Sequence, residues 1–171
     1  IGIGSYPQET GWSQINGDKD ANVVEESLKG IGFRNTTKLI NSQATKVNIL
    51  DQLNTMLDSC QQGDVVLFYF AGHGQLILDY AAAVLDGYDE SLVLYGAPKQ
   101  YDALYKNENH LLVDELSDII NKFRIKLGPQ GEFIVVIDAG FGWMSTSTTH
   151  ITRGGAYPLE EKFESHSFSN I

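Results

Sequence analysis

Residues 64–74, DVVLFYFAGHG, carry the clearest fold signal in this chain. The unbroken apolar run over residues 65–70 predicts a β-strand that is buried on both faces. His73 follows the strand between two glycines. Gly72 and Gly74 permit sharp backbone turns and close approach, so we expect an imidazole exposed just beyond the strand end.

The rest of the chain predicts alternating strands and helices. Strand-like runs are found at residues 1–6, 33–40, 91–95 and 132–138, the last being EFIVVID. Apolar residues at helical spacing predict helices over residues 18–31, 44–57 and 111–127. We expect the stretch 75–109 to be irregular apart from the run at 91–95, and the Ser-, Thr- and Gly-rich tail from residue 143 to be loop.

Alternating strands and helices indicate a parallel sheet covered by helices on both faces. Ligand sites in such sheets lie beyond the carboxyl ends of the strands. The loops AGHG, after the strand ending near residue 70, and AGFG, after residue 138, should therefore meet at one edge. A histidine at one strand end and a nucleophile at the next is the arrangement for base-assisted covalent catalysis. The residue after Ala139, however, is Gly140, which has no side chain.

Cys60 cannot supply the missing nucleophile. It precedes the strand at residues 64–70, whereas His73 follows it, and seven residues of strand separate those ends by about 23 Å. Hydrogen-bond reach is about 3 Å. Cys60 is better explained as a small, partly buried hydrophobic residue.

Composition narrows the class of protein. The chain has 171 residues, of which 42% are hydrophobic, enough for one domain with a core. A net charge of −10 disfavours nucleic-acid and anionic-membrane partners, which would be repelled. The longest apolar run, residues 65–71, is too short to span a bilayer, and we expect a cytoplasmic protein. A single cysteine excludes an internal disulfide.

Several blocks together resemble the caspase-like cysteine peptidases (peptidase C14), particularly the metacaspase and bacterial orthocaspase branch. The blocks, in family order, are INGDKDANVVEESLKGIGF, NSQATKVNILDQL, DVVLFYFAGHGQ, LDGYDESLVLYGA, HLLVDELSDIINKFRIKLG and VVIDAG. The resemblance covers residues 1–157, leaving 158–171 as a tail or the start of a linker. It implies a caspase-like three-layer α/β sandwich, with a mostly parallel sheet between helices and the family's C-terminal strands absent from this chain.

The resemblance identifies the catalytic positions. The family's histidine lies in the GHG loop and corresponds to His73. Its cysteine follows Asp-x at the later strand end, in a Cys-His-Ser-Gly run, where this chain reads Gly140-Phe141-Gly142-Trp143. Glycine cannot form the acyl-enzyme thioester, and we expect Phe141 and Trp143 to cover the sheet edge. All four residues differ, which favours a naturally inactive pseudopeptidase that binds or scaffolds. The alternative is an Arg/Lys-specific cysteine endopeptidase whose nucleophile has been mutated.

The resemblance also implies an acidic pocket for a basic side chain of a peptide. Asp138 matches the Asp two positions before the family's cysteine, and Asp20 matches the Asp of its first helix. Carboxylates suit a guanidinium or an ammonium group. Each residue also has an ordinary explanation, Asp20 in the first turn of a helix and Asp138 in a loop after a strand.

No cofactor is required, but metacaspases are often stimulated by calcium. Asp114 and Glu115 resemble that calcium site, with Asp89 as a weaker candidate, and hard oxygen ligands suit the ion. Alternatively, Asp114 caps or begins the helix over residues 111–127.

The resemblance further implies a partner that completes the sheet. This would be a C-terminal small-subunit-like segment or a second chain, because an uncovered sheet edge is an aggregation liability.

Two rival functions remain open from the sequence. GIGSYP at residues 2–7 has the first two glycines of a dinucleotide fingerprint, but Tyr6-Pro7 replaces the third. A nucleotide-binding α/β domain is therefore one rival. An active peptidase that uses Ser145 or Ser147 as nucleophile is the other.

Overall fold

The computed structural model describes residues 1–78, 88–100 and 104–141. The tail from residue 143, with Trp143, Ser145 and Ser147, lies outside the described residues. The elements are η1 (Gln8–Thr10), α1 (Gly17–Gly30), η2 (Asn41–Gln43), α2 (Lys46–Ser59), β1 (Val65–Ala71), β2 (Gly74–Leu78), β3 (Tyr88–Val93), β4 (His110–Leu112), α3 (Val113–Leu127) and β5 (Glu132–Asp138). Of the helices described, none combines the length and apolar character needed to cross a bilayer.

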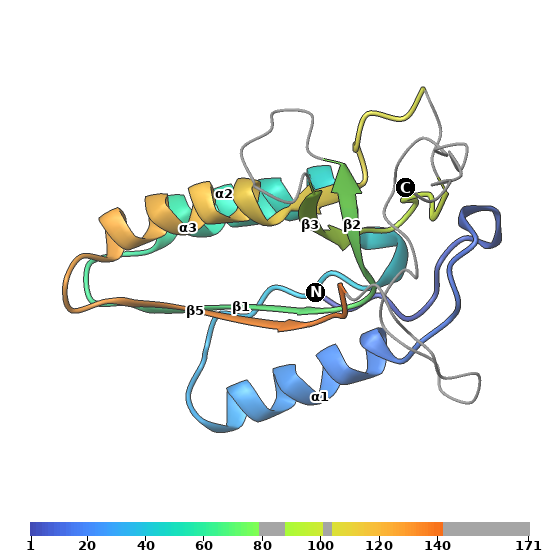
Figure 1. Cartoon of the computed structure of the whole chain (residues 1–171). Helices are drawn as coiled ribbons and strands as arrows, with labels where there is room; N and C mark the ends of the chain where they lie inside the picture. Colours follow the sequence, from blue (N-terminus) through green and yellow to red (C-terminus); the bar gives the residue numbers. More distant parts are fainter. Residues whose placement is uncertain (79–87, 101–103, 142–171) are drawn as a thin grey trace, which may run out of the picture.

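The architecture is a three-layer α/β sandwich, as the alternating pattern predicts. Helices α2 and α3 lie side by side on one face of the β1–β5 sheet, and α1 lies on the opposite face (Figure 1). Strands β1 and β5 run parallel, with Val65 opposite Glu132 and Ala71 opposite Asp138. The predicted helices and the two long strands are confirmed to within a few residues.

The first two predicted strands are wrong as strands. Residue Gly2 forms isolated parallel bridges to Ala71 and Ile40, and these are the only ladder contacts in residues 1–6 and 33–40. In the segment 33–40 only Leu39 and Ile40 contact Gly2, through one backbone hydrogen bond and one isolated bridge, and no ladder forms there among the described residues. Strand propensity without a partner gives no ladder.

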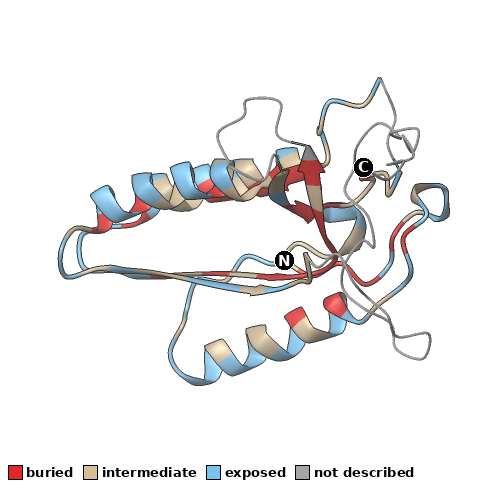
Figure 2. Cartoon of the chain, viewed as in Figure 1, coloured by how far each residue is buried: buried red, intermediate tan, exposed pale blue. Residues whose placement is uncertain are grey.

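The hydrophobic core lies between the sheet and the α2–α3 layer (Figure 2). In β1, Phe68 and Phe70 are buried. In β5, the ring of Phe133 packs on the ring of Phe123 in α3, with centroids 4.7 Å apart. Side chains alternate across a strand, so Val136, an even-numbered residue of β5, lies on the α1 side.

A close approach of backbones places the start of α1 under the end of β1. An added Cβ at Gly17 would collide with the carbonyl oxygen of Ala71 and lie 2.7 Å from that of Ile3. Only glycine permits this contact. The first turn of α1 therefore lies at the carboxyl end of the sheet.

The stretch 75–109, predicted to be irregular apart from the run at 91–95, contains most of a second sheet, and the predicted run overlaps β3 at Ser91–Val93. Strands β2, β3 and β4 form an antiparallel sheet in that order. The prediction was wrong because these strands are short and bury polar residues, including Gln75 and Ser91, which hides the alternation of apolar and polar residues. Strand β4 also takes the first two residues of the helix predicted at 111–127.

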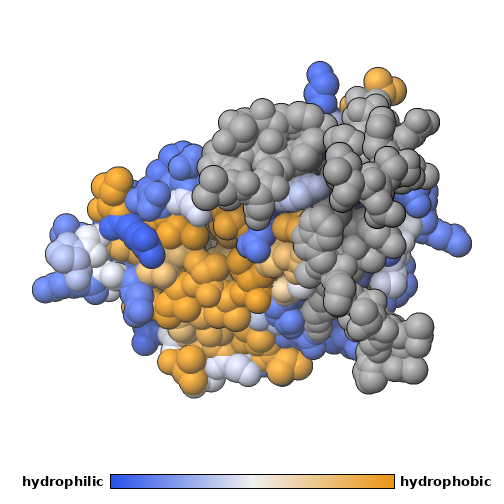
Figure 3. Space-filling view, in the orientation of Figure 1, coloured by the Kyte–Doolittle hydropathy of each residue, from blue (hydrophilic) through white to orange (hydrophobic). Residues whose placement is uncertain are grey.

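Strand β5 forms an edge of the sheet. Within the described residues it pairs only with β1. Val135 and Val136 are 38% and 41% exposed. Figure 3 shows an apolar area between the two helical layers, in the region that Figure 1 assigns to β1 and β5. This edge has the chemical character of a surface that another element covers.

Candidate functional site

The two glycine-containing loops meet at the carboxyl end of the sheet, as the parallel arrangement predicts. The backbone N–H of Gly72 donates to the carbonyl oxygen of Asp138 over 3.2 Å. A Cβ added to Gly74 would lie 2.8 Å from the carbonyl oxygen of Gly140 and 2.7 Å from Cδ1 of Phe141. Gly140 therefore lies directly beside the GHG loop. Phe141 is half-buried against this loop.

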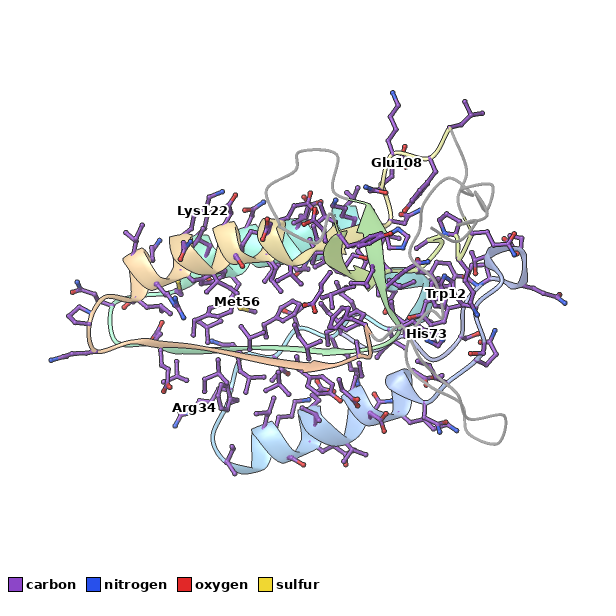
Figure 4. The ribbon with its side chains drawn as sticks, in the orientation of Figure 1. Trp12, Arg34, Met56, His73, Glu108 and Lys122 are labelled. Carbon is purple, nitrogen blue, oxygen red and sulfur yellow. The ribbon has the colours of Figure 1, made fainter. Side chains whose placement is uncertain are left out.

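His73 is buried, and the expectation of an exposed imidazole is wrong. Only 1% of the residue is exposed. Its ring stacks on Trp12, with centroids 4.7 Å apart and planes at 27°, and lies 5.1 Å from the ring of Tyr6. Figure 4 shows Trp12 and His73 close together at the end of β1. The physical reason is the segment after the first bridge, residues 5–16, which folds over the imidazole.

The hydrogen bonds of His73 determine its tautomer. Nε2 lies 2.9 Å from the carbonyl oxygen of Ser13. A carbonyl only accepts, so Nε2 carries the proton and Nδ1 is the basic nitrogen. A histidine held in this way suits a general base that acts through Nδ1. Its backbone N–H donates to the hydroxyl of Tyr6 over 3.0 Å, which fixes the loop as well as the ring.

Three residues around the imidazole were missed by the sequence reasoning, namely Tyr6, Trp12 and Ser13. A signal was available. The segment between the first predicted strand and the first predicted helix must also leave the sheet at its carboxyl edge, because the strands are parallel. Its aromatic residues were therefore candidates to line the site.

The two carboxylates predicted for a basic side chain lie at the same end of the sheet. Asp20 is half-buried in the first turn of α1. Asp138 is exposed at the end of β5, opposite Ala71 in the ladder. Because the residues of β5 alternate, Asp138 lies on the α1 side. An acidic subsite from these residues stays a prediction.

One of the residues predicted to bind calcium, Glu115, has other partners in the structure. Glu115 accepts a hydrogen bond from the backbone N–H of Leu112 over 3.0 Å and pairs with Nζ of Lys46 at 2.7 Å. Asp114 is exposed in the first turn of α3, and Asp89 lies in β3. Among the described residues, no cluster of three or more His, Cys, Asp or Glu could hold a metal ion. Calcium binding stays a prediction.

The structure supports the exclusion of Cys60 as nucleophile. Cys60 caps the C-terminus of α2, before β1, whereas His73 follows β1. Its thiol donates to the carbonyl oxygen of Leu57 over 3.3 Å, and burial raises the pKa of this thiol. A buried thiol with a raised pKa is a poor nucleophile.

A further hollow in the described part of the molecule is not lined by His73. It is a groove of about 1050 Å³ between α1, residues 31–38 and the start of β1. Its lining includes Val24, Leu28, Phe33 and Val66. Neither His73 nor Gly140 lines this groove, which runs along β1 from Val65 to Tyr69.

The glycines of the GIGSYP segment do not form a phosphate site. A Cβ at Gly4 would collide with the carboxylate of Asp18, and one at Gly2 would collide with the backbone of α1. These glycines allow the segment to pack against the start of α1. A carboxylate in this position would repel a phosphate group, so the structure does not support a nucleotide site here.

The fold and the site together define a caspase-like α/β domain. A buried histidine follows one parallel strand, and Gly140, the position predicted for the nucleophile, follows the neighbouring strand. The family profile described as "Metacaspase, peptidase C14 domain" matches residues 20–144. The chain belongs to this family.

Curated fungal relatives agree with this assignment. The chain is 30% identical to Metacaspase-1 of Coccidioides immitis over 79 residues, which is 46% of this chain and 15% of that protein. It is 31% identical to Metacaspase-1A of Aspergillus niger over 81 residues, 47% of this chain and 18% of that protein. The matched segments thus span less than a fifth of these relatives' own lengths.

A solved structure confirms the fold. Protein GSU0716 from Geobacter sulfurreducens matches with a TM-score of 0.62 at 22% identity. The match covers 81% of this chain and 47% of that protein, so this chain corresponds to about half of its length.

Proposed function

We propose that this chain is a metacaspase-type domain without its nucleophile, and that it binds a basic peptide without cleaving it. The observation that carries the proposal is the position of Gly140, which lies at the end of β5 beside the GHG loop. His73 is held in a tautomer that suits a base, yet the neighbouring residue has no group for it to deprotonate. Acyl transfer through a thioester is therefore closed in this chain.

Binding needs fewer groups than cleavage. Asp20 and Asp138 remain, and a guanidinium or ammonium group would form charge-assisted hydrogen bonds with them. The net charge of −10 also favours a basic partner over an acidic one.

The exposed edge of β5 supports a second part of the proposal. A C-terminal small-subunit-like segment would pair with β5 and cover Val135 and Val136. The structural neighbour is consistent with such a segment, because the match leaves more than half of that protein's length unmatched. A second copy of the chain is the competing occupant, and size-exclusion chromatography with light scattering separates the two.

Peptide hydrolysis tests the central claim. Fluorogenic peptides ending in Arg, Lys or Asp are incubated, with and without calcium, with three proteins: the chain as it stands, Gly140→Cys, and Gly140→Cys/His73→Ala. We expect no cleavage by the first and third proteins. Cleavage after Arg or Lys by the second, dependent on His73, is expected if the cleft is otherwise intact. Cleavage by the unaltered chain would refute the proposal.

Peptide binding is measured separately by calorimetry. An uncleaved peptide ending in Arg is expected to bind the unaltered chain. Asp20→Asn is expected to weaken binding by about tenfold to a hundredfold, because a hydrogen bond to a charged group is worth about 1.5–3 kcal/mol. The matched peptide ending in Asp serves as the control. Equal affinity for the two peptides would exclude the acidic subsite.

If Gly140→Cys cleaves, activity returned by that one residue would also be consistent with an endopeptidase that has lost its nucleophile by mutation.

A further inference from the structure

A network of buried polar side chains lies in the small antiparallel sheet, next to the site. Gln75 follows the GHG loop at the start of β2 and is 1% exposed, and His110 begins β4 and is fully buried. Nε2 of His110 lies 3.0 Å from Oε1 of Gln75, and Nδ1 lies 2.8 Å from the hydroxyl of Tyr105. Burying polar groups costs free energy of desolvation that apolar residues in the same space would not, so we expect such a network to have a structural or functional role.

Each hydrogen bond in the network has a defined direction. Nε2 of Gln75 donates to the carbonyl oxygen of Lys99 over 3.0 Å, so Oε1 faces His110 and accepts from its Nε2–H. Nδ1 of His110 then accepts from the hydroxyl of Tyr105, whose oxygen accepts from the backbone N–H of Asn109 over 2.8 Å. Burial lowers the pKa of His110 to about 3, so the imidazole is neutral.

Lys99, whose carbonyl oxygen accepts from Gln75, also contacts the segment that covers His73, residues 5–16. Its backbone N–H donates to the carbonyl oxygen of Thr10 over 2.9 Å, and its Nζ lies 5.3 Å from the centre of the Trp12 ring. The indole N–H of Trp12 donates to the carbonyl oxygen of Ala97 over 3.0 Å. Residues 97–99 and 10–12 are thus joined at three points.

The covering segment in turn determines the state of His73. Trp12 stacks on the imidazole, and the carbonyl oxygen of Ser13 accepts from Nε2. We propose that Gln75 and His110 are positioning residues, which hold the 97–99 loop and through it the Trp12–Ser13 contacts that set the orientation and tautomer of His73. The purpose of this arrangement rests on the proposed function of the same site, but its structural part can be measured independently.

The test replaces Gln75 by Met, which has similar volume and no hydrogen-bonding amide. Ser91→Ala is the matched control, because the buried Ser91 hydroxyl donates to the backbone carbonyl of Gln75 over 2.8 Å, so this variant leaves the side-chain amide of Gln75 in place. Long-range ¹H–¹⁵N NMR spectra report the tautomer of His73. Hydrogen exchange of the Trp12 indole N–H reports how often its hydrogen bond to Ala97 opens, and so how firmly residues 10–12 are held against residues 97–99.

In Gln75→Met we expect His73 to show a mixture of tautomers in place of the single Nε2–H form. We also expect the indole N–H to exchange about fivefold faster, as the loss of a hydrogen bond worth about 1 kcal/mol predicts. Ser91→Ala is expected to change neither signal. If Gln75→Met and Ser91→Ala leave His73 in the same single tautomer, the proposal is overturned.

Tyr105→Phe provides a second route if Gln75→Met does not fold. It removes only the outermost hydroxyl of the network, and we expect it to move the His73 signals in the same direction. Unchanged signals in this variant would also overturn the proposal.

A kinetic arm uses the Gly140→Cys background, where Gln75→Met is expected to lower kcat with little change in KM. Cleavage by the unaltered chain would refute the proposed function, whereas the tautomer measurement decides the role of Gln75 and His110 whatever the activity of Gly140→Cys. If Gln75 and His110 had only a structural role, Gln75→Met and Tyr105→Phe would lower the stability of the fold and leave the tautomer of His73 unchanged.

Discussion

Acidification is expected to destabilise this fold through His110. Burial, with a smaller contribution from the charge of Lys46, lowers the pKa of this imidazole from 6.5 to about 3. Between these values the unfolded chain binds a proton that the folded chain does not, so stability falls as the pH falls. The contribution of His110 is fully present above the unfolded pKa and is lost progressively below it.

The magnitude follows from linkage. Lowering the pH from about 7 to about 5 protonates the unfolded histidine almost completely and the folded one hardly at all. The free energy of unfolding should therefore fall by about 2 kcal/mol through this residue alone. In a domain of this size such a loss is a large fraction of the total stability.

Urea denaturation followed by tryptophan fluorescence at the two pH values measures this loss. His110→Gln is the reference, because it has no titrating group here, while the other ionisable groups contribute equally to both proteins. We expect the variant to lose about 2 kcal/mol less than the wild type over this interval. Parallel losses in the two proteins would refute the reasoning.

Three further predictions concern stability. Phe123→Ala, at a fully buried position in the core, should lower the free energy of unfolding by about 3–5 kcal/mol, measured by urea denaturation. A loss below about 1 kcal/mol would mean that this core is loosely packed. Gly17→Ala should cost about 1–3 kcal/mol, because the new Cβ meets the immovable carbonyl of Ala71; a neutral effect on the melting temperature would contradict the close approach. Lys46→Met should lower the free energy of unfolding by no more than about 1 kcal/mol, because Glu115, its partner in the ion pair, is 40% exposed. A larger loss that persists in high salt would show that Lys46 has a role beyond this ion pair.

The main layers of the fold could be predicted because they follow regular patterns. The apolar run at β1 and the spacing in α1, α2 and α3 each encode a local structure that the tertiary fold does not override. The convergence of the two glycine loops followed from strand direction alone. The strands at residues 1–6 and 33–40 could not be predicted correctly, since a ladder depends on what lies beside a strand, and the sequence pattern does not contain that.

The site was only partly predictable. His73 and Gly140 were found because each follows a strong strand. The burial of His73 was missed, because it depends on Trp12 and Ser13, about sixty residues away along the chain. The buried pair Gln75 and His110 was also missed, since polar residues in short strands resemble loop residues until their partners are known.

The edge of β5 has a consequence for how this protein behaves at different concentrations. A strand tethered by a short linker reaches an effective concentration of about millimolar at its own binding site, whatever the protein concentration. A strand from a second molecule competes only at its bulk concentration. With a tethered strand attached, the domain would remain monomeric on dilution and on concentration alike. Without a tethered strand, self-association through Val135 and Val136 would rise with protein concentration. The edge of β5 would thus bind an intramolecular strand in the first case and act as an oligomerisation surface in the second.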